Sequence, residues 1–447
     1  MKITFVGAGS SVFVKKVIGD SMLSEALQDA DFALYDIDKE RLNESKLMLE
    51  TLNRNINNSR ANIESFYGET ARREALKDAN FVVNAIQVGG YEPSTVIDFE
   101  IPKKYGLQQT IGDTLGIGGI FRALRTIPAM IEIAQDIEKV AQDAWLLNYT
   151  NPMAMVTNAV IESTDVRIVG LCHSVQKCVP GLIESLNINT DSKSLKWQIA
   201  GINHQAWLLE LLADGVDIYP EVKKRAEEKN RVARLNSEKH DDMVRFEMMK
   251  HFGYYLTESS EHSSEYFPYW IKNTHPELIS EFNIPLDEYP RRCLLQIESW
   301  KEQSKTMIGN PELTHERSDE YASRIMEAIT LDQPIRIHGN VLNTGLVSNL
   351  PNESCVEVPC LVDRNGVNGC VVGRLPEQCA ALNRTNINVQ LLAVEAALGK
   401  DRDKIYQAAM LDPHTSSELT LDEIVSLCDN LIEAHGDMLP QYKNTRN

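Results

Sequence analysis

The first half of the chain alternates short apolar runs with longer segments whose apolar residues recur at helical spacing. Five apolar runs predict buried strands, at residues 2–6, 31–38, 80–86, 145–152 and 166–173. The segments between them predict helices, notably over 11–27, 39–57 and 119–142. Strands alternating with helices indicate βαβ units, and right-handed crossovers then favour an α/β fold with a doubly wound, Rossmann-like parallel sheet.

The second half has a different pattern. Residues 197–212 are typical of strands, and 221–252 predict a polar helical stretch. Mixed strands near 335–362 precede helices over 377–438. This indicates an α+β domain that closes over the first. A chain of 447 residues is also long for one domain. We therefore expect a nucleotide-binding domain over 1–195 and a second domain over 196–447 for substrate, metal and oligomer contacts.

Charge and composition exclude several classes of function. The formal net charge is -19, so phosphate backbones are repelled and nucleic-acid binding is not expected. No run of about 18 apolar residues occurs, so no membrane span is expected. The N-terminal segment lacks the long apolar stretch and cleavage site of a signal peptide. We expect a cytoplasmic protein whose eight cysteines are reduced thiols.

A glycine turn follows the first predicted strand. Gly7, Gly9 and Ser10 lie between this strand and the next helix, where glycines permit close approach of the backbone to a pyrophosphate. The helix N-terminus adds N–H donors and a favourable dipole. The third glycine of the full fingerprint is absent, and Val12 occupies its place. The alternative is a turn in an α/β domain that binds no nucleotide.

Two acids end the second predicted strand. Asp36 and Asp38 stand where a carboxylate can bind the ribose 2′-hydroxyl and repel a 2′-phosphate. This favours NAD over NADP as the cofactor. Surface acids without a ligand would explain the same residues.

Polar and metal-ligating residues follow the later strands. Asn148 and Asn151 end the fourth, where amides can read sugar hydroxyls or can simply form an Asn-Pro turn. Cys172 and His173 end the fifth, and His204 begins the second domain. A thiolate and the imidazole of His204 could together hold a divalent ion, or both could be buried core residues. The stretch 257–270 combines acids, hydroxyls and aromatics, which suits either a sugar pocket or the solvated end of a helix.

Through nearly its whole length the chain resembles glycoside hydrolase family 4, most closely the NAD- and Mn-dependent α-galactosidases of the melibiase type. The motifs that carry the resemblance are KITFVGAGS (2–10), ALYDID (33–38), GGYEPSTV (89–96), GDTLGIGGIFRALRTIP (112–128), NYTNPMAM (148–155), GLCHSV (170–175), GINH (201–204), ESSEHSSEY (258–266), LDEYPRR (286–292) and TNINVQ (385–390).

The resemblance implies NAD and Mn²⁺, or another divalent metal, as cofactors. It implies a second domain similar to that of lactate and malate dehydrogenases, and a homo-oligomer, either dimer or tetramer. It also implies that Cys172 and His204 are the metal ligands. Tyr266 falls near the catalytic base of some members.

Several positions are implied to contact the sugar. Asn151 and Arg291 match sugar-binding positions of the family. Asp113, in the GDTLG motif, and Asn148, in the NYTNP motif, are further candidates for substrate binding. Together they predict a polar sugar site beside the metal.

Departures from the family pattern indicate the sugar class. Members that act on 6-phosphorylated sugars have an aspartic acid, proposed as the catalytic acid, where this chain has His173, which makes His173 a candidate catalytic residue here. These members also carry an arginine near the position of Thr95, which argues here for an unphosphorylated sugar. CHSV further differs from the CHEV typical of members acting on uronic acids. We expect an α-galactoside as substrate, with an α-glucoside or α-uronide as alternatives.

Most glycosidases use two carboxylates, but the resemblance implies a redox route. NAD⁺ takes hydride from C3, the C2 proton becomes acidic and is removed, the group at C1 leaves by elimination, and water and hydride are then returned. The rival reading is a 2-hydroxy-acid dehydrogenase of the lactate or malate type. It would require an HGD-like catalytic motif, which the sequence lacks. A third reading, a non-catalytic NAD sensor, is disfavoured by the pair Cys172 and His204.

Overall fold

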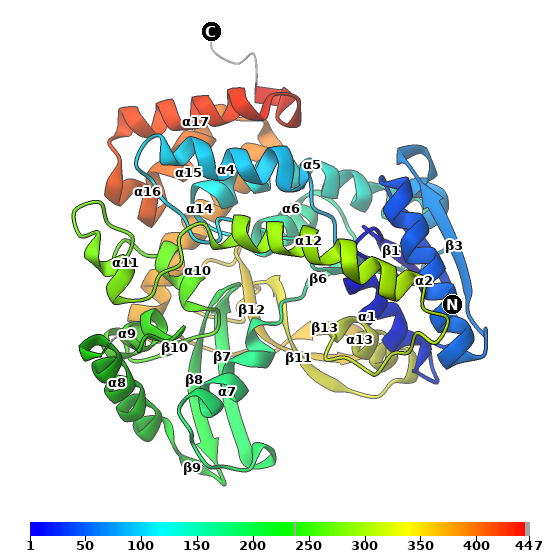
Figure 1. The fold of residues 1–447 in the computed structure, drawn as a ribbon, viewed down its shortest axis with the longest axis horizontal. Coiled ribbons are helices and arrows are strands. Elements are labelled where there is room, and N and C mark those ends of the chain that lie inside the picture. The colour runs from blue at the N-terminus through cyan, green and yellow to red at the C-terminus, as the bar shows by residue number, and fades with distance from the viewer. Residues whose placement is uncertain (237, 443–447) are drawn as a thin grey trace.

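One mixed sheet runs through the whole molecule, and helices pack on both of its faces (Figure 1). The structure is a computed structural model, which describes residues 1–236 and 238–442. Within this part thirteen strands form the sheet, in the order β3-β2-β1-β4-β5-β6-β11-β12-β7-β8-β10, with β9 beside β8 and β13 beside β12.

The strands are β1 (Lys2–Val6), β2 (Asp31–Asp36), β3 (Asn62–Tyr67), β4 (Phe81–Asn84), β5 (Trp145–Asn148), β6 (Arg167–Gly170), β7 (Leu195–Ile202), β8 (Gln205–Ala213), β9 (Val216–Asp217), β10 (Tyr255–Leu256), β11 (Ile335–Leu342), β12 (Cys355–Asp363) and β13 (Gly366–Gly369). The helices are α1 (Ser11–Met22), α2 (Lys39–Asn57), α3 (Arg72–Leu76), α4 (Val96–Lys103), α5 (Gly116–Val140), α6 (Met153–Ser163), α7 (Ser174–Ser185), α8 (Tyr219–Leu235), α9 (Met243–Phe252), α10 (Ser260–Glu265), α11 (Glu277–Glu281), α12 (Glu288–Ile308), α13 (Tyr321–Leu331), α14 (Glu377–Gly399), α15 (Arg402–Leu411), α16 (Pro413–Glu418) and α17 (Leu421–His435).

The first six strands are parallel, in the order 3-2-1-4-5-6. This order is that of a Rossmann sheet and confirms the predicted doubly wound fold. The order also fixes the site, because the strand order reverses between β1 and β4 and ligands bind at the carboxyl ends of strands beside such a point.

The antiparallel part joins the parallel part through a single residue pair, Asn340 of β11 with Gly170 of β6. Within the antiparallel part, one further pair, Glu357 with Gly201, links β12 to β7. The hairpin β7–β8 therefore approaches the carboxyl end of β6. The division at residue 195 stays a prediction, since one sheet crosses it.

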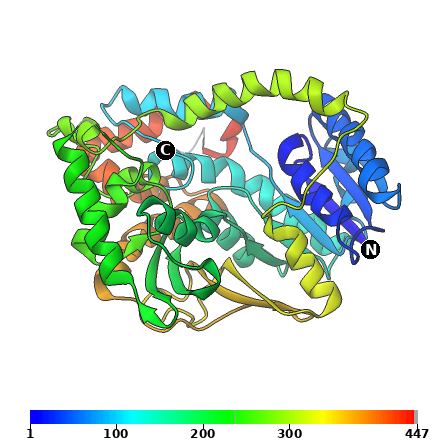
Figure 2. The ribbon, with the colours of Figure 1, turned by 60° about the horizontal axis from the view of Figure 1, so that its bottom comes forward.

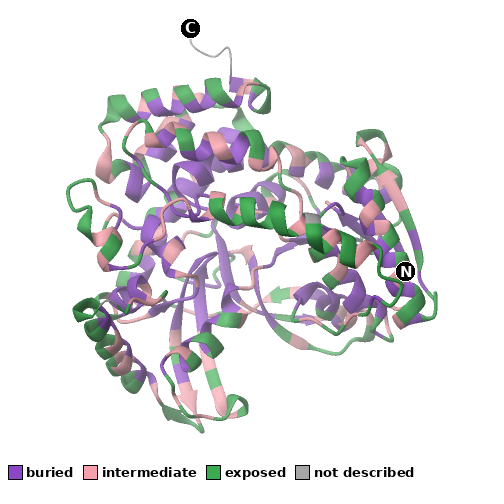
Figure 3. Ribbon diagram, in the orientation of Figure 1, coloured by how far each residue is buried: buried purple, intermediate pink, exposed green. Residues whose placement is uncertain are grey.

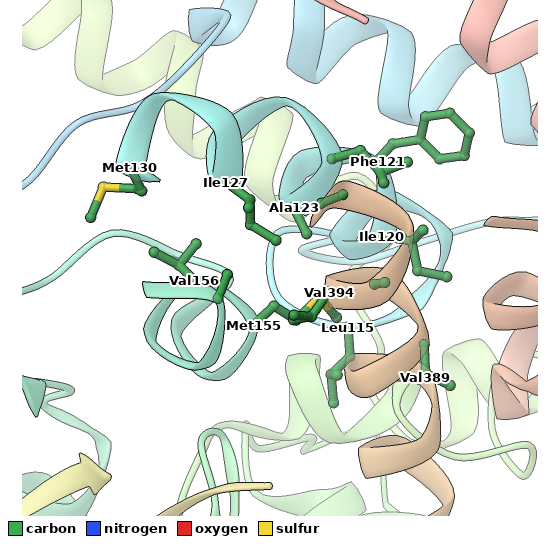
Figure 4. Packing of buried hydrophobic residues seen from close by; sticks show 14 of the residues in the cluster. Leu115, Ile120, Phe121, Ala123, Ile127, Met130, Met155, Val156, Val389 and Val394 are labelled. Atoms are coloured by element: carbon green, nitrogen blue, oxygen red, sulfur yellow. The ribbon is translucent and has the colours of Figure 1, made fainter. Parts of the chain in front are cut away.

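The largest core lies between helices and one face of the sheet. Helix α5 contributes Ile120, Phe121 and Ile127 to a cluster that also takes residues from α6 and α14 (Figure 4). These side chains are at most 1% exposed. Full burial of one such side chain contributes about 1.5–3 kcal/mol, so this cluster fixes α5 and the residues at its N-terminal end.

Several elements of the structure were not predicted, among them β3 and α12. Strand β3 lies at the edge of the sheet, and its alternation is weak because several of its side chains face solvent. Helix α12 crosses the molecule from the side of α10 to α2 and is exposed along most of its length (Figures 1, 2 and 3). Residues 221–252, predicted as one helical stretch, form the two helices α8 and α9.

Among the helices of residues 1–236 and 238–442, none combines the length and the apolar composition required to cross a bilayer.

Candidate active site

A cavity of about 430 Å³ lies at the carboxyl ends of β4, β5 and β6. The glycine-turn helix α1 borders it on one side through Ser10 and Phe13. The hairpin β7–β8 and the segment before α10 border it on the other, through His204 and Glu258. The cavity thus connects the predicted nucleotide site with the predicted metal site.

The glycine turn is built for close backbone approach. Gly7 has φ +88°, and a Cβ there would lie 2.8 Å from the carbonyl oxygen of Ala85. Its N–H and that of Ala8 both donate to the carbonyl of Tyr35, which fixes the turn, located between β1 and α1, against the end of β2. The turn delivers Ser10 to the cavity at the start of α1. This arrangement fits a dinucleotide at the helix N-terminus.

The two predicted ribose acids differ in their surroundings. Asp36 accepts hydrogen bonds from the backbone N–H groups of Gly9, at 2.6 Å, and Asp38, at 2.8 Å. It therefore stands directly beside the glycine turn. Asp38 caps α2, because its side chain accepts from the N–H groups of Glu40 and Arg41. The structure gives Asp38 a capping role, whereas Asp36 has the position expected of a ribose ligand.

Cys172, His204 and Glu258 converge at the other end of the cavity. One ligand atom from each lies within 4.8 Å of the others. Burial by itself lowers the pKa of His204, but interactions with Cys172 and with the Glu258 carboxylate raise it to about 10. The Glu258 carboxylate places negative charge beside this imidazole, which favours a cation. The S, N and O donors fit a divalent transition metal, with substrate oxygens free to complete the shell.

The local folds of two loops place these ligands. The backbone N–H of Ser174, the first residue of α7, lies 3.5 Å from Cys172 Sγ, and the helix dipole favours negative charge there. His204 forms the turn of the β7–β8 hairpin at φ 61°, a conformation that is uncommon for residues other than glycine. Such strained positions are frequent at ligand sites.

Tyr266 lies directly behind His204. Its hydroxyl is 3.3 Å from His204 Nδ1, and the side chain is 0% exposed. Burial raises its pKa well above the usual value for tyrosine. Tyr266 is therefore within reach of the metal ligand, while the cavity wall itself is formed by other residues.

Asp113 and Asn151 form a polar wall of the same cavity. Asn151 Nδ2 donates to Asp113 Oδ2 at 3.2 Å, and the hydroxyl of Thr114 donates to Oδ1 at 2.7 Å. Burial opposes ionisation of Asp113, yet His262 and Arg122 hold its pKa well below the usual range. The wall thus offers a carboxylate and an amide beside the metal site, as sugar hydroxyls require.

His173 lies at the cavity edge and contacts an acid that is far from it in the sequence. Its Nε2 is 2.5 Å from an oxygen of Glu320, the residue that precedes α13. Tyr149 and Tyr321 flank the ring, with centroids 5.9 and 6.5 Å away. A carboxylate on Nε2 fixes the ring and leaves Nδ1 as the nitrogen available to a substrate.

Two predicted substrate residues lie elsewhere. Asn148 is fully buried behind the cavity, where its amide bonds Asn84 and Thr150. Arg291 is on the exposed side of α12, with its guanidinium paired to Glu288 at 2.6 Å. In this structure neither one lines the cavity.

Several residues of the cavity and its edge have no role assigned from the sequence, among them Arg122, Glu258, Tyr289 and Glu320. Glu258 and Tyr289 lie inside motifs that carried the resemblance, so their type and position were a usable signal. Arg122 also lies inside such a motif, over 112–128, in which only Asp113 received a role. Glu320 is 147 residues from His173 along the chain, and nothing in the local sequence relates the two.

Two protein-family models match most of the chain. The model described as family 4 glycosyl hydrolase matches residues 2–188, and the model of the family 4 C-terminal domain matches 199–415. The chain belongs to glycosyl hydrolase family 4. It is 58% identical over 442 residues to a protein named alpha-galactosidase from Bacillus subtilis (strain 168), covering 99% of this chain and 100% of that relative.

Solved structures support the fold. A 6-phospho-alpha-glucosidase from gut microorganisms, in complex with NAD and Mn²⁺, superposes with a TM-score of 0.77 at 22% identity, covering 99% of each chain. Malate dehydrogenase from Plasmodium falciparum superposes with a TM-score of 0.50 at 14% identity, covering 91% of this chain and 99% of that one. These likenesses concern the fold alone and confirm the expected dehydrogenase-like architecture.

Proposed function

We propose that this family 4 member hydrolyses unphosphorylated α-galactosides with the help of NAD and a divalent metal ion, Mn²⁺ by preference. The observation that carries the proposal is the single cavity, which joins the glycine turn to the cluster of Cys172, His204 and Glu258. The 58% identity to a protein named alpha-galactosidase supports the choice of sugar.

The residues of this chain divide into three groups around the sugar. Gly7, Gly9 and Ser10 would hold the dinucleotide, and Cys172 with His204 would hold the ion. When bound, NAD supplies a reversible hydride acceptor and the ion a Lewis acid. Asp36 stands beside the glycine turn at the place of the ribose hydroxyls.

Other side chains orient the sugar and handle protons. Asp113 and Asn151 present acceptor and donor atoms to hydroxyl groups. His173, fixed through Nε2 by Glu320, can exchange a proton at Nδ1 with the oxygen of the leaving group. The role of Tyr266 as base stays a prediction, since its hydroxyl faces His204 in this structure.

The test is a panel of aryl glycosides assayed with and without NAD⁺, Mn²⁺ and a thiol reductant. We expect nitrophenol release from the α-galactoside, dependent on all three additions, with no net accumulation of NADH. Full-speed hydrolysis after removal of dinucleotide and metal would contradict the proposal. Stoichiometric NADH formation from a hydroxy acid would identify a dehydrogenase instead.

We also propose that the protein self-associates in the cytoplasm. Helix α12 exposes Leu294, Leu295 and Ile297 by 50, 50 and 46% of their surface. Three neighbouring large apolar side chains on one helix are unusual on a surface that stays in water. A second copy of the chain covering α12 is the partner most consistent with an expected dimer or tetramer.

A further inference from the structure

Arg122 is a buried cation whose hydrogen-bonding capacity is largely unused. It lies on α5, lines the cavity and is 8% exposed. A guanidinium carries five N–H donors. Among the residues that the structure describes, one acceptor meets them: the hydroxyl of Tyr289, 3.1 Å from Nη1. The remaining donors are not among the buried atoms that lack a partner in the described residues, and Arg122 lines the cavity, so these donors are open to a ligand there.

Arg125, three residues later on the same helix, shows the contrast. Its two terminal nitrogens donate to Asp98 at 3.1 and 2.6 Å, and its Nε donates to the carbonyl of Val88 at 3.2 Å. Arg125 is 4% exposed and does not line the cavity. These partners explain the burial of Arg125 without any ligand. The single partner of Arg122 leaves most of its donors unpaired within the part of the chain that the structure describes.

The position of Arg122 is fixed from two sides. The Tyr289 ring lies 5.6 Å from its guanidinium carbon, in the range of a cation–π contact. Tyr289 is in turn anchored, because its backbone N–H donates to the carbonyl of Thr110 at 3.0 Å. Gly119 lets the loop carrying Asp113 pack on α5, since a Cβ there would lie 2.6 Å from the carbonyl carbon of Thr114.

The neighbours of Arg122 favour a neutral ligand. An arginine alone would suit a phosphate or a carboxylate. Asp113 in the same wall carries a negative charge and is joined to Arg122 by charge attraction rather than by a hydrogen bond. Glu258 adds a second carboxylate to the cavity. An anionic sugar would be repelled by both, while a hydroxyl can accept from Arg122 and donate to Asp113.

We propose that Arg122, held by Tyr289, is a specificity-determining residue that donates a hydrogen bond to a hydroxyl oxygen of an unphosphorylated hexopyranoside. The inference rests on the proposed glycosidase function. Because the proposed reaction engages C2 and C3, the hydroxyl is that of C4 or C6. Arg122 and Asp113 together then distinguish a neutral sugar from phosphorylated and uronic sugars.

The experiment measures calorimetric affinities of the NAD- and Mn²⁺-loaded protein for galactose, 4-deoxygalactose and 6-deoxygalactose. A hydrogen bond to a charged group contributes about 1.5–3 kcal/mol, so wild-type protein should bind one deoxy sugar about 10- to 100-fold more weakly than galactose. Arg122→Met should bind galactose more weakly and lose most of this discrimination. Tyr289→Phe should lose part of the same discrimination. This variant tests the inference if Arg122→Met does not fold.

Arg125→Lys is the matched control, because it changes the same residue type on the same helix. It should lower Tm while leaving the discrimination between the sugars unchanged. Wild-type discrimination in both Arg122→Met and Tyr289→Phe would overturn the inference even if aryl α-galactosides are cleaved. If wild-type protein cleaves no α-galactoside and binds none of the three sugars, the proposed function fails as well.

Discussion

The hydroxyl of Tyr266 lies 3.3 Å from Nδ1 of His204, on the side of the imidazole away from Cys172 and Glu258. Nε2 of the same ring lies 3.5 Å from Glu258. Tyr266 therefore orients the imidazole so that Nε2 faces the candidate metal position. Histidine ligands of metals commonly have such a partner on their second nitrogen, and it sets both tautomer and orientation.

Tyr266→Phe separates this orienting role from a role as base. Loss of the partner should weaken Mn²⁺ binding about 10- to 100-fold, as measured by titration of the NAD-loaded protein. If orientation is the whole role, saturating Mn²⁺ restores turnover. If Tyr266 is also the base, turnover stays low and exchange of the C2 proton with solvent is lost at any Mn²⁺ concentration.

Replacement of either main metal ligand should abolish turnover. Cys172→Ala and His204→Ala remove donors from the cluster but leave the glycine turn intact. We expect no detectable release of nitrophenol and nearly unchanged NAD affinity, measured by fluorescence quenching. Wild-type rates in either variant would rule out the proposed metal position.

Glu320→Gln tests the contact between Glu320 and His173. The amide keeps the size of the side chain but loses the carboxylate that fixes His173 Nε2. We expect a fall in kcat of about 10- to 100-fold with little change in KM. His173→Ala should cost at least as much, and the double variant should cost no more than His173→Ala alone, because the two residues act as one unit. Additive losses would show that Glu320 acts elsewhere.

Ile297→Glu tests the exposed face of α12. A charge at this position, which is 46% exposed, should weaken self-association without unfolding the chain. Sedimentation velocity should show a smaller species than wild type. Val371→Glu, a change at an exposed apolar position on another surface, is the control and should leave the assembly unchanged. An unaltered oligomer in Ile297→Glu would place the interface elsewhere.

The sequence was sufficient for the part of the site that local patterns determine. Apolar runs predicted five of the six parallel strands, and the residues at their carboxyl ends include Cys172 and Asn151, which the structure places in the cavity. The pairing of Glu320 with His173 depends on how α13 packs, which no local pattern reports. Asp38 shows another limit, because a helix cap and a ribose ligand both favour an acid after a strand. The exposure of α12 could likewise not be predicted from the sequence, because its apolar residues would also fit a buried helix.

Glu357 predicts a specific dependence of stability on pH. It is fully buried on β12, where Asn340 Nδ2 donates to one oxygen at 3.2 Å and the other oxygen has no partner in the described part of the chain. Burial raises the pKa of Glu357 to about 7, although the neighbouring His204 opposes this. An unfolded glutamic acid ionises near pH 4.3. Between these values the folded chain retains a proton that the unfolded chain releases, so stability falls as the pH rises.

This contribution is present in full below about pH 4 and is lost by about pH 7, a change of roughly 4 kcal/mol. Glu357→Gln stays neutral and should remove that loss. In metal-chelated protein its Tm should exceed that of wild type by a larger margin at pH 8 than at pH 5, measured by calorimetry. The exposed Glu312→Gln is the control and should follow wild type at both values. A constant difference in Tm between Glu357→Gln and wild type would mean that the folded protein holds Glu357 ionised throughout.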